Sequence, residues 1–114
     1  SIICYNQVIR FNSDDPNAWF NRGNALANLK KFEEAIPCYD KSLSLDSEDL
    51  RALFNKANSL ANLKKFEEAI ECFDKVIKKN PGYPSALRYK GVALKKLGRD
   101  EEAENCFKKD KELE

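Results

Sequence analysis

The chain has 114 residues, of which 42% are hydrophobic and 34% charged, a composition typical of one helix-rich domain. Its net charge of +1 gives no overall attraction to nucleic acid or to an anionic membrane. It contains no histidine, which excludes serine–histidine and cysteine–histidine nucleophile pairs and histidine metal ligands. The sequence has neither the long apolar run of a membrane span nor the pattern of a secretory signal, so we expect a cytoplasmic protein without membrane contact.

Apolar residues recur at intervals of three and four along most of the chain, which predicts α-helices. Asp15 followed by Pro16 is a typical helix opening, because proline is favoured at the first helical position. Residues 80–84 (Asn-Pro-Gly-Tyr-Pro) predict a break, whereas Pro37 falls inside a helix and is expected to cause a bend at most. We expect seven helices, at about residues 2–11, 16–29, 32–45, 50–63, 66–79, 84–97 and 100–113.

A period of 34 residues runs through the sequence. Four cysteines share one place in this period: Cys4, Cys38, Cys72 and Cys106. Metal-binding cysteines occur in pairs two to four residues apart, so this even spacing predicts equivalent small buried residues instead of a metal site. The eleven residues LANLKKFEEAI also occur twice, at 26–36 and 60–70. A fixed period of this length predicts a solenoid of stacked units.

The predicted fold class is therefore all-α, a superhelical solenoid of antiparallel helix pairs that forms one domain over residues 1–114. Residues 1–15 are expected to be the second helix of a partial repeat. Complete repeats are expected at residues 16–49, 50–83 and 84–114. Because each unit of a solenoid buries its apolar face on a neighbour, we expect a piece of a longer array whose open ends can associate.

Small residues recur on both helices of each unit, where they let the two helices approach closely: Gly23, Ala57 and Gly91 on the first, and Ala35, Ala69 and Ala103 on the second. The pattern resembles the tetratricopeptide repeat family. The matching residues are Trp19, Gly23, Leu26, Phe32, Ala35 and Tyr39, then Leu53, Ala57, Leu60, Phe66, Ala69, Phe73 and Pro81, then Leu87, Gly91, Leu94, Ala103 and Phe107. The resemblance implies a right-handed superhelix whose concave groove, lined by the first helices, binds an extended peptide or a helix of a partner.

The residues expected to face this groove lie along the first helices: Asn17, Phe20, Asn21, Asn24 and Asn28, then Arg51, Phe54, Asn55, Asn58 and Asn62, then Ser85, Arg88, Tyr89, Val92, Lys95 and Lys96. The six asparagines that recur at spacings of three and four share one face, and their amides can both donate to and accept from a peptide backbone. Similar asparagine ladders line the groove in repeat domains of some glycosyltransferases and transport receptors. Duplication of surface asparagines would produce the same regularity, so both interpretations stay open.

Residues 75–99 contain eight basic and no acidic residues. Arg88, Lys95 and Lys96 are expected to face the groove, where an acidic segment or a terminal carboxylate of a partner would dock. The alternative is a solvated surface with compensating acids on neighbouring helices. One subtype of the family clamps acidic tails with lysine and arginine, but three of its basic places hold Phe20, Ser85 and Tyr89, so this clamp is not expected.

The function predicted from the sequence is a protein-binding scaffold without catalysis, cofactor or metal. The acidic pairs at 33–34, 67–68 and 101–102 follow the repeat and lie near helix starts, where negative charge is favourable, so they do not indicate a catalytic constellation. The alternatives are a structural or self-assembling spacer that uses its open ends, or the substrate-recruiting part of a larger enzyme. A nucleic-acid partner is not expected, because the basic window belongs to one unit and lacks a base-stacking platform.

Overall fold

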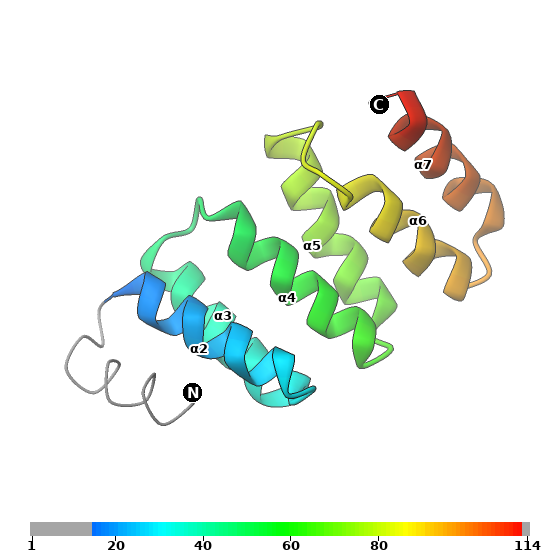
Figure 1. The fold of residues 1–114 in the computed structure, drawn as a ribbon. Helices are drawn as coiled ribbons and strands as arrows, with labels where there is room; N and C mark the ends of the chain where they lie inside the picture. The colour runs from blue at the N-terminus through cyan, green and yellow to red at the C-terminus, as the bar shows by residue number, and fades with distance from the viewer. Residues whose placement is uncertain (1–14, 113–114) are drawn as a thin grey trace.

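The computed structural model describes residues 15–112, and this part of the chain forms six α-helices in three antiparallel pairs (Figure 1). The helices are α2 (Pro16–Asn28), α3 (Phe32–Leu45), α4 (Leu50–Asn62), α5 (Phe66–Lys79), α6 (Ala86–Lys96) and α7 (Asp100–Glu112). The all-α class and the six helices predicted over this range are confirmed. The helix expected at residues 2–11, with Cys4, lies outside the described residues.

Aspartates cap the first helices of the first two pairs. The Asp15 carboxylate accepts a hydrogen bond from the Asn17 amide at 2.9 Å, and the Asp49 carboxylate accepts one from the Arg51 amide at 3.0 Å. The third pair differs, since α6 begins two residues later than the sequence predicted. Ser85 has a left-handed backbone (φ 67°) and its side chain caps nothing, so the helix cannot include it.

The turn inside each pair has one geometry three times. Lys30, Lys64 and Gly98 occupy equivalent positions and have positive φ angles of 61°, 64° and 79°. The amide of the residue that follows each of them donates back to the helix before it, for example Lys65 to the Leu60 carbonyl at 2.9 Å. This is the Schellman ending of a helix, which favours glycine because glycine has no Cβ to clash in a left-handed conformation.

Lys64→Gly is therefore expected to raise the free energy of unfolding by about 0.5–1 kcal/mol, since Lys64 is exposed and its backbone is in the region that disfavours side chains. Gly98→Lys should lower it by a similar amount. A Cβ added at Gly98 meets no atom within 4 Å, so this change isolates the backbone cost. Urea unfolding followed by circular dichroism measures both variants. A less stable Lys64→Gly protein would contradict this account.

Small residues face aromatic rings where the two helices of each pair cross. A Cβ built on Gly23 would lie 2.7 Å from Cε1 of Tyr39, and one built on Gly91 would lie 2.6 Å from Cε1 of Phe107. The middle pair has Ala57 at the same place, in the core with the fully buried ring of Phe73. The predicted close approach of the helices is confirmed, and rings fill the space beside it.

Gly23→Ala is expected to destabilise the domain by about 1–3 kcal/mol, because the ring that it would displace is itself fixed. Tyr39 is 1% exposed, and its hydroxyl is held by a hydrogen bond to Asn24. Gly91→Ala should cost less, because Phe107 is only half-buried and can move outwards. Thermal or urea unfolding of the two variants tests this order. Equal losses would show that the freedom of the ring does not decide the cost.

Successive pairs are joined by equivalent ion pairs as well as by apolar contacts. Lys56 on α4 contacts Asp40 on α3 at 2.6 Å, and Lys90 on α6 contacts Asp74 on α5 at 2.6 Å. Both residues of the second ion pair lie 34 positions after those of the first. Helix α4 also packs against α3 and α5 and touches α2 and α6, so the three pairs form one continuous stack.

The outer face of α7 is charged where the earlier helices are apolar. Ile70 and Ile77 on α5 pack against the core of the third pair. Their equivalents on α7, 34 positions later, are Glu104 and Lys111, and both are exposed. The positions that stack one pair on the next are therefore adapted to water on α7.

Pro37 and the described cysteines fit inside their helices. Helix α3 continues across Pro37 to Leu45. Cys38, Cys72 and Cys106 are free and buried, and burial raises the pKa of each thiol above its ordinary value. They act as small apolar residues and not as reactive thiolates.

Candidate functional site

The first helices of the three pairs, α2, α4 and α6, follow one another in a row (Figure 1). We call their outward side the groove face. Of the residues predicted there, the exposed ones are Asn17, Asn21, Asn28, Arg51, Asn62, Arg88, Tyr89, Val92, Lys95 and Lys96. Those of intermediate exposure are Asn24, Phe54, Asn55, Asn58 and Ser85, and Phe20 is buried.

Two of the asparagines link neighbouring helices. The Asn24 side-chain oxygen accepts hydrogen bonds from the Tyr39 hydroxyl at 2.7 Å and from the Asn55 amide at 2.9 Å. These bonds tie α2 to its own partner α3 and to α4 of the next pair. Asn24 and Asn55 therefore use part of their hydrogen-bonding capacity to join α2, α3 and α4. Sequence reasoning missed Tyr39 here, although its hydroxyl distinguishes it from Phe73 and Phe107 in the other repeats.

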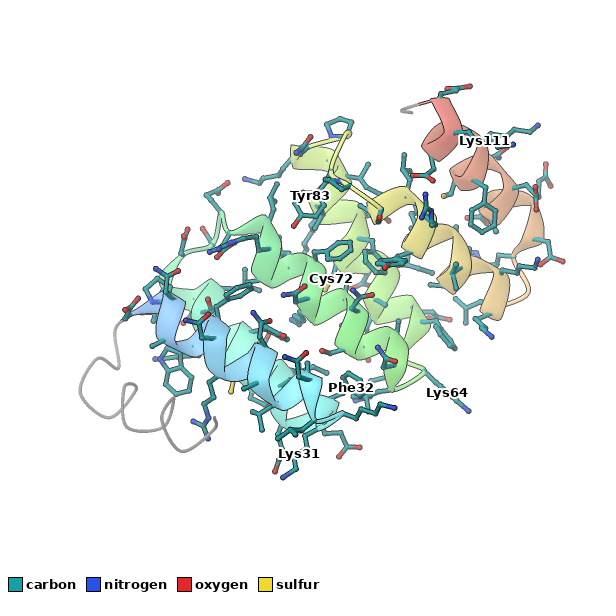
Figure 2. The ribbon with its side chains drawn as sticks, in the orientation of Figure 1. Lys31, Phe32, Lys64, Cys72, Tyr83 and Lys111 are labelled. Atoms are coloured by element: carbon teal, nitrogen blue, oxygen red, sulfur yellow. The ribbon has the colours of Figure 1, made fainter. Side chains whose placement is uncertain are left out.

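Other asparagine amides stay open. A pocket of about 350 Å³ lies between α2 and α4, and Asn28 and Asn58 line it together with Asn24 and Asn55. Within residues 15–112, the side chains of Asn28 and Asn58 make no hydrogen bond, and neither does that of the exposed Asn21. Their amides are thus available to a ligand backbone. In Figure 2, Phe32, which also lines this pocket, lies near the α2–α3 turn, towards the opposite end of α4 from Tyr83.

The groove face becomes apolar between the second and third pairs. The Phe54 ring packs against those of Tyr83 and Tyr89, with centroids 5.3 and 5.4 Å apart. Tyr89 is 39% and Val92 44% exposed, one helical turn apart on α6. Tyr83 was not predicted as a site residue, because it lies in the α5–α6 connection, where helical spacing gives no signal.

Phe20 and Arg51 are engaged in contacts within the first two pairs. The Phe20 ring packs at a tilt against the Tyr39 ring. The Arg51 guanidinium lies 4.6 Å from the centroid of the Phe20 ring. Arg51 also forms a bidentate ion pair with Asp49, and these hydrogen bonds hold the pKa of Arg51 above its ordinary value. Phe20 presents little surface to a ligand, and the charge of Arg51 is balanced by Asp49.

Half of the eight basic residues between 75 and 99 have acidic partners. Arg88 contacts Asp110 on α7 at 3.3 Å, Lys90 contacts Asp74, and Lys79 and Arg99 pair with Glu48 and Glu102. Lys95 and Lys96 are exposed in the last turn of α6 and have no ion pair within the described range. The unbalanced positive charge of the groove face therefore lies at Lys95 and Lys96 and not at Arg88.

Burial raises the pKa of Tyr39 to about 12. A phenol with a raised pKa holds its proton more firmly in the folded chain than in the unfolded chain. Its contribution to stability is complete below the unfolded pKa of about 10, and it is lost as the pH rises towards 12.

We expect the free energy of unfolding to fall more steeply between pH 10 and pH 12 in the wild type than in Tyr39→Phe. At pH 8 the variant should lose about 0.5–1.5 kcal/mol with its hydrogen bond to Asn24. Urea unfolding at pH 8, 10 and 11 provides both measurements. Parallel pH profiles of the two proteins would show that Tyr39 does not carry this dependence.

Three stacked antiparallel helix pairs with a period of 34 residues and an open row of first helices define a helical-repeat domain. A tetratricopeptide repeat model matches residues 16–49 and 50–83, and a second tetratricopeptide repeat model matches residues 72–105. The chain belongs to the tetratricopeptide repeat family. The third match starts inside α5, out of register with the helix pairs, and the third pair is also the one whose outer and groove faces have changed most.

Solved structures of MamA show the same fold. One aligns with a TM-score of 0.94 at 22% identity and covers 98% of this chain. MamA from Desulfovibrio magneticus RS-1, residue 41 to the end, aligns at 0.93 with 24% identity over 99% of this chain, and MamA MSR-1 at 0.90 with 24% identity over 98%. The chain spans 64–66% of the length of these proteins. A search of curated proteins finds no match.

The described residues show neither a metal-binding cluster nor a membrane span. No group of three or more histidine, cysteine, aspartate or glutamate side chains within residues 15–112 is placed to hold a metal ion. None of the helices described is long and apolar enough to cross a membrane.

Proposed function

We propose that this chain is a cytoplasmic protein-binding scaffold, whose groove face holds an extended segment of a partner protein. One domain, with repeats at residues 16–49, 50–83 and 84–114, would supply that face. The proposal includes no catalytic step, cofactor or metal. The observation that carries it is the set of open amides at Asn21, Asn28 and Asn58, which line the groove face beside an exposed apolar pair.

The physical basis is a set of unpaired amides on helices that are joined by hydrogen bonds. The links from Asn24 to Tyr39 and Asn55 fix α2, α3 and α4, so a ligand would not need to order these helices when it binds. Each amide–backbone hydrogen bond contributes about 0.5–1.5 kcal/mol net. An extended segment that meets several amides would bind with modest affinity and little dependence on its side chains.

The groove is favoured over the C-terminal end of the stack as the binding surface. Glu104 and Lys111 place charge where α5 has the stacking residues Ile70 and Ile77, so the outer face of α7 is poorly suited to stack on another copy. A role as a self-assembling spacer would depend on other surfaces. Recruitment of a substrate for a larger enzyme would use the same groove and is compatible with the proposal.

The test begins with linear peptides selected by phage display on the wild-type domain, whose affinities are measured by fluorescence anisotropy. We expect the triple variant Asn21→Ala, Asn28→Ala, Asn58→Ala to bind them at least tenfold more weakly, because about three hydrogen bonds are lost. The matched control is Asn105→Ala, an exposed asparagine on α7 that lines a different pocket. Unchanged affinity in the triple variant would sink the proposed function. Loss caused by Lys108→Ala, Lys111→Ala would instead assign binding to the outer face of α7.

A further inference from the structure

The groove face changes its chemistry at equivalent positions of successive repeats. Tyr89 stands 34 residues after Asn55, Val92 after Asn58, and Lys96 after Asn62, while Lys95 follows Ala61. The first two repeats therefore present amides, whereas the third presents two apolar side chains followed by two lysines. Duplication of surface asparagines does not explain this part of the groove, because every asparagine has been replaced there.

The Tyr89 side chain is held in place by aromatic rings before any ligand arrives. The Tyr89 ring lies 5.4 Å from that of Phe54 and 6.3 Å from that of Phe73, and these two rings also pack edge to face. Val92 follows one turn later with 44% of its surface exposed. Covering an ordered apolar surface of this kind with an apolar side chain lowers the free energy of the complex.

The two lysines determine the charge that a ligand would carry next to its apolar side chain. Lys95 and Lys96 lie about one turn beyond Val92 and have no acidic partner within residues 15–112. Four residues of helix rise about 6 Å, which an extended peptide covers with about two residues. The length of a lysine side chain adds about one residue of tolerance. A ligand that lies along α6 would therefore place a carboxylate two or three residues from an apolar side chain.

We propose that this part of the groove selects an extended segment of a partner in which a large apolar side chain lies two or three residues from a carboxylate. The apolar side chain covers Tyr89 and Val92, and the carboxylate meets Lys95 and Lys96. The carboxylate is the side chain of an aspartate or glutamate within the segment. Arg88 takes no part, because Asp110 already balances it. This inference rests on the proposed function and adds to it a fixed spacing between the apolar side chain and the carboxylate of the ligand. We call this spacing the register.

The probes are fluorescein-labelled nine-residue peptides of serine and glycine that carry one phenylalanine and one glutamate. We expect the peptide with a spacing of two or three residues to bind about three- to tenfold more tightly than those with a spacing of six, with glutamine for glutamate, or with serine for phenylalanine. A second series replaces the glutamate with a free or an amidated C-terminus. Tighter binding of the peptide with a free C-terminus than of the glutamate peptide would contradict a side-chain carboxylate as the recognised group.

The protein variants use the residues that the second repeat carries at the same places, so each is compatible with the fold. Lys95→Ala, Lys96→Asn should abolish the preference for glutamate over glutamine and weaken the dependence on salt. Tyr89→Asn, Val92→Asn should abolish the preference for phenylalanine. Lys75→Ala, Lys78→Ala is the matched control, since these two lysines on α5 are exposed and lie outside the groove face. Circular dichroism verifies that each variant is folded.

The outcomes separate the register from the function beneath it. Peptides that bind the wild type and lose affinity in Asn58→Ala, but are indifferent to spacing or to Lys95→Ala, Lys96→Asn, refute the register alone. If neither these peptides nor the phage-selected ones respond to Asn21→Ala, Asn28→Ala, Asn58→Ala, the groove is not the binding surface and both proposals fail. A preference for the predicted spacing that disappears in both variants supports the register.

Discussion

The close contact between a small residue on one helix and an aromatic ring on the next is the constraint on which this structure depends. Gly23 meets Tyr39 and Gly91 meets Phe107 at distances that leave no space for a Cβ. The middle pair has Ala57 and Phe73 at the same positions, so a small residue faces an aromatic ring in all three pairs and each pair can repeat the packing of the one before it. The first helices consequently lie in one row (Figure 1).

The aromatic ring of this contact differs between the first two pairs, and so does the polarity of the interface beside it. The hydroxyl of Tyr39 bonds Asn24, which in turn holds Asn55, so the first interface between pairs is joined by amides. Phe73 occupies the equivalent place without a hydroxyl and packs against Phe54, as Tyr39 packs against Phe20. It also packs against Tyr89, which stands 34 residues after Asn55. The first interface is therefore polar and the second aromatic because both the hydroxyl of Tyr39 and the amide of Asn55 have been replaced. Asn58, the equivalent of Asn24, has no phenol to bind and its amide stays open.

The apolar spacing and the period of 34 residues together predict the helices, their pairing, the buried cysteines and the close approach at Gly23 and Gly91, because these depend on residues within one unit. They do not predict which groove residues are already engaged. The link from Asn24 to Asn55 and the ion pair of Arg88 with Asp110 depend on how side chains of different helices meet in space. Tyr83 escapes prediction for another reason, since it lies in a connection where no helical period applies.

The third pair departs from the repeat on two faces, and the departures have opposite physical sense. On its outer face, Glu104 and Lys111 replace isoleucines, which improves contact with water. On the groove face, Tyr89 and Val92 replace asparagines and leave apolar surface exposed, which solvation opposes. Solvation accounts for the first change and cannot account for the second. The proposed ligand, which covers Tyr89 and Val92 and meets Lys95 and Lys96, accounts for the second change.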